Sequence, residues 1–310
     1  MSKEASVGVP VDDVIDAVDD CDPATTREAL DPVTVDGAVT RDAIEAAVSD
    51  TSKLLATAET RVELVGNAYD DAVAAADPVS HLDIVRVRLD AFAERLSAVE
   101  SRISELRPDL TVPADLSERP QSAYELAMEL REVATDAQGI ARTADDLSFD
   151  IDEFNSWLER PARRHQEFAE DVDLVRNSVE ELAAVVEKLP GETADSAAQW
   201  ADARMRAHVL SLLASDLRAE LRDLRALAER DGTEVPVDLP TRLEQIETRT
   251  AEIEAELEAR ADRAWRDRFG SDLAAFEDAL DPFEPPVDWG AVERIAAEHR
   301  PETAMASDAE

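Results

Sequence analysis

The sequence predicts an all-α protein made of two tandem antiparallel three-helix coiled-coil units, arranged like a rod of spectrin repeats. Apolar residues recur at alternating three- and four-residue steps over long stretches, which keeps one seam of each helix facing its partners. Only 8 of the 310 residues are glycine and 4% are aromatic, a composition typical of long helices. The seam pattern also occurs twice along the chain.

The first unit is expected over residues 40–148. Its first helix carries an apolar seam from Ile44 to Ala76, after which Asp77-Pro78 supplies a cap and a first-turn proline. The second helix carries a seam from Leu82 to Leu106, and the third from Leu126 to Leu147. Because the connections are short, sequential helices are expected to lie antiparallel.

The second unit is expected over residues 149–270 and repeats the first. A shift of 110 residues places residues 62–67 on residues 172–177, so that Leu64 matches Leu174 on the outer side of the seam. The sequence has neither glycine nor proline at the join between the units. We therefore expect a continuous helix from one unit into the next, kinked at Pro161, where a backbone hydrogen bond is lost.

The two ends differ from the repeats. Residues 1–39 are expected to form an acidic segment with one short helix. Gly270 is expected to end the last long helix. Residues 271–299 then read as short helices interrupted by prolines, with Asp288 capping the last of them, and residues 300–310 as a disordered tail.

The charge of the chain indicates a salt-rich environment. The formal net charge is -40, and only three of the 32 basic residues are lysine. Such a surface is typical of haloarchaeal proteins, because molar salt shortens the Debye length and weakens the repulsion. It disfavours nucleic acid and anionic membranes as partners. The sequence also lacks an apolar leader and any apolar run near the ~20 residues of a membrane span, so a cytoplasmic protein without membrane insertion is expected.

No catalytic or metal-binding motif stands out. Cys21 is the only cysteine, and the four histidines occur without the spacing of a metal site. The sequence has no phosphate-binding glycine loop and no Gly-x-Ser-x-Gly motif. We therefore expect no enzyme activity, cofactor or metal. His165 falls on the predicted seam, where it is either a protonation switch or ligand, or a core polar residue that fixes the helix register.

Candidate partner-binding residues fall into three sets, and each has an alternative structural role. The two arginine clusters either receive an acidic partner or nucleic acid, or pair with neighbouring carboxylates. The C-terminal apolar side chains either anchor another protein or fold back on the end of the rod. The sets are Arg160, Arg163 and Arg164; Arg260, Arg263, Arg266 and Arg268 around Trp265; and Phe276, Phe283, Trp289 and Ile295.

Four segments resemble a haloarchaeal family often labelled "halo transducer protein": residues 39–44, 59–64, 89–92 and 154–158. The resemblance implies a role beside sensory transducers, although the chain lacks their membrane span, linker and signalling hairpin. Three functions are compatible with the sequence. The first is a structural protein that scaffolds or spaces other proteins, and self-association is compatible with it. The others are a cytosolic signalling adaptor and an accessory of chromosome-organising coiled coils.

Overall fold

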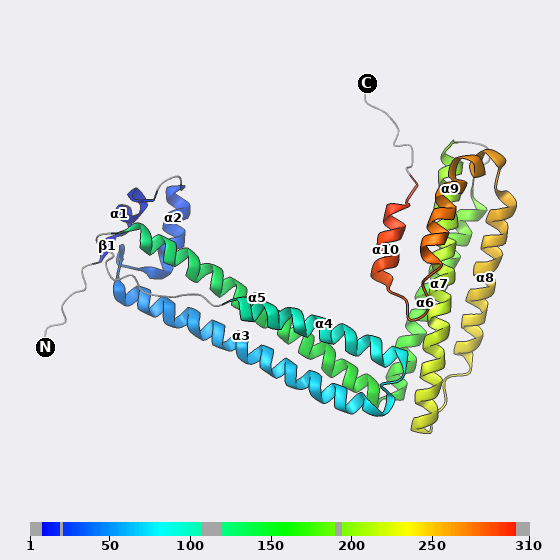
Figure 1. Cartoon of the computed structure of the whole chain (residues 1–310), viewed down its shortest axis with the longest axis horizontal. Coiled ribbons are helices and arrows are strands. Elements are labelled where there is room, and N and C mark those ends of the chain that lie inside the picture. The colour runs from blue at the N-terminus through cyan, green and yellow to red at the C-terminus, as the bar shows by residue number, and fades with distance from the viewer. Residues whose placement is uncertain (1–7, 19–20, 107–118, 190–193, 302–310) are drawn as a thin grey trace. The chain divides into compact units, whose positions relative to one another are not determined.

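The computed structural model has a predominantly helical fold, which confirms the predicted all-α class (Figure 1). The structure describes residues 8–18, 21–106, 119–189 and 194–301. Within these ranges it contains ten α-helices, two short 3₁₀-helices and one small sheet. Contacts divide the chain into unit 1, with Met1–Asp77 and Arg88–Asn155, and unit 2, with Pro78–Val87 and Ser156–Glu310.

Three long helices form most of unit 1: α3 (Arg41–Ala76), the greater part of α4 (Asp83–Glu105), and α5 (Gln121–Glu159). The side chain of Thr40 caps α3 by accepting a hydrogen bond from the backbone N–H of Ala43 at 3.2 Å. The predicted seams of all three helices are largely buried. Helix α5 contacts α4 through the rings of Phe92 and Phe154, whose centroids lie 5.7 Å apart. It also contacts α3 through the ion pair between Arg61 and Asp145.

The N-terminal segment of unit 1 forms a small cap on α3 and α5. It contains β1 (Val9–Pro10), α1 (Val11–Asp16), α2 (Pro23–Leu30), the 3₁₀-helix η1 (Asp31–Val33), β2 (Thr34–Val35) and β3 (Ala38–Val39). The three antiparallel strands have the order β1-β3-β2. The apolar side chains of the cap share one buried cluster with the first turn of α3 and the first turns of α5.

The prediction of a single helix in this segment was therefore incomplete. It identified α1 and missed both α2 and the sheet. Two-residue strands are too short to show an alternating pattern, and β2 and β3 are joined by Asp36 and Gly37. Both turn residues have positive φ, 53° and 78°, as the tight turn of a hairpin requires.

Unit 2 is built around helix α7. It contains α6 (Pro161–Glu187), α7 (Ala194–Asp231), α8 (Asp238–Arg260), α9 (Arg263–Leu280) and α10 (Trp289–Glu298). Helix α7 packs against α6, α8 and α9, while α6 also packs against α8 and α10 against α9 (Figure 1). Helix α9 is thus a third helix packed on α7, so that four helices pack together where the three-helix pattern predicted three.

The boundary between α5 and α6 differs from the expected kinked helix. Helix α5 ends at Glu159, and Pro161 is the first residue of α6. Arg160, between them, is extended, with φ -119° and ψ 97°. A proline disfavours the helical conformation of the residue before it, and its own fixed φ suits a first helical position. The prediction of a continuous helix was wrong because both effects act at the same place.

The predicted helix end at Gly270 was also wrong. Helix α9 runs through Gly270, whereas the chain breaks at Ala261, which is extended. The next residue, Asp262, caps α9 by accepting a hydrogen bond from the backbone N–H of Ala264 at 2.8 Å. A glycine inside a helix costs only about 1 kcal/mol, so packing of α9 on α7 is enough to continue the helix.

The C-terminal residues follow the prediction more closely. The chain is non-helical from Asp281 to Asp288, and the side chain of Asp288 caps α10 by accepting a hydrogen bond from Ala291 at 3.0 Å. Residues 302–310 of the predicted tail lie outside the described residues.

Two leucines of α6 provide a matched test of the seam. Leu182 is fully buried, whereas 65% of Leu174 is exposed. We expect Leu182→Ala to lower the free energy of unfolding by about 2–5 kcal/mol, since the substitution leaves a cavity. Leu174→Ala should change it by less than about 0.5 kcal/mol. Urea unfolding at constant salt measures both. Equal costs would mean that the buried face of α6 is misassigned.

Candidate partner-binding surfaces

The indole of Trp200 on α7 fixes the junction between α8 and α9. Its Nε1 donates a hydrogen bond to the carbonyl of Leu257, in the last turn of α8, at 2.9 Å. Its ring lies beside that of Trp265, in the first turn of α9, with the centroids 6.0 Å apart. Because both indoles are buried, this contact holds the reversal between α8 and α9 against α7.

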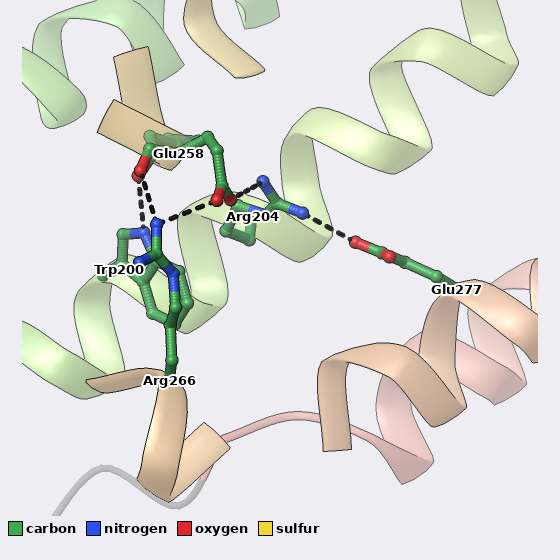
Figure 2. Close-up of polar contacts among 6 residues, drawn as sticks. Trp200, Arg204, Glu258, Arg266 and Glu277 are labelled. Atoms are coloured by element: carbon green, nitrogen blue, oxygen red, sulfur yellow. Dashed lines mark hydrogen bonds and ion pairs between the residues drawn. The ribbon is translucent and has the colours of Figure 1, made fainter. Parts of the chain in front are cut away.

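Arginine–carboxylate contacts surround this junction (Figure 2). Arg204 on α7 donates to Glu258 on α8 at 3.2 Å and to Glu277 on α9 at 3.0 Å. Arg266 on α9 donates to the same Glu258, at 2.8 Å to its carboxylate and 3.0 Å to its backbone carbonyl. The two guanidinium groups therefore connect three helices through Glu258 and Glu277.

The arginine cluster predicted around Trp265 is thus divided among internal contacts. Arg260 donates to the carbonyl of Val186 at 2.8 Å and to Glu256 at 2.6 Å. The guanidinium of Arg268 lies 4.7 Å from the ring centroid of Phe269. Arg263 remains largely exposed, with Asp267 at 3.8 Å. For Arg260 and Arg266, pairing with neighbouring carboxylates is the arrangement that the structure adopts.

The other arginine cluster does not form one surface. Arg164 is buried and donates to the carbonyls of Trp157 at 3.1 Å and Leu158 at 2.6 Å. It also forms an ion pair with Asp231 at the end of α7. Arg164 therefore donates to backbone carbonyls at the end of α5 that have no acceptor role within the helix. In this conformation its guanidinium cannot reach a partner protein. Of the other two members, Arg160 is exposed and Arg163 is half-buried.

His165 is half-buried, and Arg164 takes the central seam position expected for it. From Phe168 onward the buried residues of α6 are those of the predicted seam, so the departure is confined to the first turn after the break at Arg160. Nε2 of His165 is buried without a hydrogen-bond partner among the described residues. Burial, and secondly the charge of Arg164, lower the pKa of His165 below its usual value.

This environment predicts that His165 opposes folding at acidic pH. The native state holds the imidazole neutral, while the unfolded chain takes up a proton near pH 6.5. The stability of the native chain relative to His165→Gln should therefore fall as the pH is lowered from about 7.5 to about 5.5. Urea unfolding of both chains at several pH values measures this difference. The carboxylates are the same in both chains, so their contribution to the free energy of unfolding cancels. A constant difference, or one that grows at low pH, would contradict the assignment.

The predicted C-terminal anchors fold back on unit 2. Phe276 is fully buried between the rings of His208 and His299, at centroid distances of 6.0 and 5.9 Å. Trp289 donates from Nε1 to Asp216 at 2.9 Å, and this carboxylate also accepts from the backbone N–H of Val287 at 3.3 Å. Phe276 is therefore a core residue.

The other two predicted anchors, Phe283 and Ile295, are half-buried, as is Trp289. Of the two alternatives that the sequence left open, folding back is the one that the structure adopts for the C-terminal segment.

The sequence reasoning missed the central position of α7 and the role of Asp216. A usable signal was present, because α7 begins with small apolar residues on several faces, and Ala198, Ala201 and Ala203 are all buried. A helix that is apolar on several faces is enclosed by neighbours. Asp216 lies between the buried Ala214 and Leu217, where an acid suggests an internal donor.

Metal sites and membrane-spanning helices are absent from the described residues. Among the described residues no group of three or more His, Cys, Asp or Glu side chains could hold a metal ion. Within the same ranges, none of the helices combines the length and the apolar character needed to cross a membrane. No protein-family model, curated protein or solved structure matches the chain.

Proposed function

We propose that this protein is a non-enzymatic helical scaffold that holds protein partners in a salt-rich cytosol. The proposal assumes that its two units act as tandem three-helix segments of a rod. One observation carries it: leucines that match under the predicted internal repeat both point outward. Leu64 on α3 is 60% exposed and Leu174 on α6 is 65% exposed.

Unit 1 has a second large apolar side chain that is exposed. Phe149 on α5 is 63% exposed. Leu64 lies three residues after Arg61, and Phe149 lies four residues after Asp145, so each is a surface neighbour of one member of the Arg61–Asp145 ion pair. Exposed large apolar side chains near a contact between α3 and α5 favour this side of unit 1 as a protein contact.

In unit 2 the residue before the matching leucine contacts another helix. This residue, Asp173, pairs with Arg242 of α8, whereas Leu174 points to a different side of α6. A single exposed leucine is common on protein surfaces. Core packing, however, constrains only the seam and gives no reason for a leucine at the same outward position of both repeats. Two related contact sites on one chain are what a scaffold requires.

Affinity capture from a lysate kept at molar potassium chloride tests this function. The full chain should retain partners, and Leu64→Glu or Leu174→Glu alone should reduce them. The double variant should lose them, because a carboxylate prevents burial of an apolar contact. Val237→Glu is the matched control, since Val237 is 86% exposed and is not part of the leucine match. A folded double variant that keeps every partner would contradict the proposal.

The identity of the captured proteins separates this function from the alternatives. Transducers among them would favour the signalling adaptor that the family resemblance implies. Chromosome-organising proteins would favour the third function, and recovery of a second copy of the chain would show a homo-oligomer.

A further inference from the structure

Unit 2 contains a hollow between α6, α7 and α10 that the scaffold function does not use. Its volume is about 300 Å³. The apolar part of its lining comes from Met205, Val209, Leu210 and Ala296. Its polar lining residues are Ser178, Asp202, Arg206 and Arg300. Small-molecule sites have this character, with a mainly apolar lining and a few polar groups that orient the ligand.

A second hollow of about 420 Å³ lies at the end of α10 and shares Met205 and Arg300 with the first. Its lining includes Arg268 and His299 together with Asp272 and Glu298. The two arginines and two carboxylates of this second lining balance in charge, so only the first hollow has an excess of arginine.

The charge of the first hollow is opposite to that of the chain. Overall, 72 acidic residues stand against 32 basic ones, whereas this lining holds two arginines and one aspartate. Arginines elsewhere in unit 2, such as Arg204 and Arg218, form ion pairs with glutamates. Within the described ranges, Arg206 and Arg300 are exposed and form no hydrogen bond or ion pair.

We propose that this hollow binds a small apolar molecule that carries one carboxylate. The carboxylate would contact the guanidinium groups of Arg206 and Arg300, whose forked donors match two oxygens. The chain of the ligand would cover Met205, Val209 and Ala296. Salt screens the attraction between charges but does not weaken the burial of apolar surface. A ligand that has an apolar chain as well as a carboxylate therefore suits a salt-rich cytosol.

Calorimetric titration with three probes of equal chain length tests the proposal on the full chain. Octanoate should bind at least about tenfold more tightly than octanol, as one charge-assisted contact of about 1.4 kcal/mol implies. Octylammonium should bind most weakly. In the double variant Arg206→Gln, Arg300→Gln the preference for octanoate should disappear. Arg222→Gln is the control, because Arg222 is an exposed residue of α7 outside the hollow.

A second variant separates the apolar contact from the charge. Ala296→Phe should fill the hollow and remove binding of both octanoate and octanol, while circular dichroism confirms that the fold is kept. The proposal would be overturned if octanoate does not bind, if octanol binds equally well, or if the arginine variant keeps the preference. It would also be overturned if octanoate bound only after the acidic residues of 302–310 were replaced by neutral ones. The two arginines would then be binding sites for carboxylates of this chain and not for a ligand.

Discussion

The structure depends on one balance: each long helix buries at least one apolar stripe, with α7 buried on several sides, and this burial must outweigh the mutual repulsion of a chain with net charge -40. The stripes are made mainly of alanine, valine and leucine, and residues such as Ile44, Leu147 and Leu182 are fully buried. Burial of one such large side chain contributes about 1.5–3 kcal/mol. Because like charges act over the whole surface, the number of stripe positions and the salt concentration together decide whether the helices stay associated.

Arginine–carboxylate contacts give the association its particular geometry. Arg95 reaches from α4 to Asp150 on α5 at 2.7 Å, and Arg218 reaches from α7 to Glu247 on α8, where the carboxylate raises the pKa of the guanidinium. The planar fork of a guanidinium matches the two oxygens of one carboxylate with parallel hydrogen bonds, a geometry that the ammonium of lysine does not offer. These contacts connect neighbouring helices within each unit.

The seam positions could be predicted from sequence because they follow a 3.5-residue period. Ile44, Val65 and Leu147 were assigned to seams and are buried. Local chemistry that competes with the period was harder to predict. The effect of Pro161 on Arg160 separated α5 from α6, and Asp262 started a new helix where Gly270 had been expected to end one. Helix α2 carried a readable signal in the cap Asp22 followed by Pro23.

The candidate site residues were predicted less well, because a cluster in sequence says little about which side chains a fold encloses. Arg164 and Phe276 were candidates for partner binding, with ion pairing and folding back as their structural alternatives, and both are buried, while Asp216 was not identified. Arg206 lies on α7, and Arg300 lies two residues beyond the end of α10, 94 residues later in the sequence (300 minus 206); both line one hollow only because α10 folds back on α7. Such a site depends on tertiary contacts that no local pattern contains.

The balance between burial and repulsion is tested most directly by the melting temperature of the full chain against potassium chloride concentration. Between ~0.01 M and ~1 M salt the Debye length falls from about 30 Å to about 3 Å. The melting temperature, followed by circular dichroism, should rise steeply over this range, and sucrose, which stabilises folded proteins without screening charge, should not reproduce the rise. A melting temperature that is independent of salt, or that sucrose raises equally, would contradict the account.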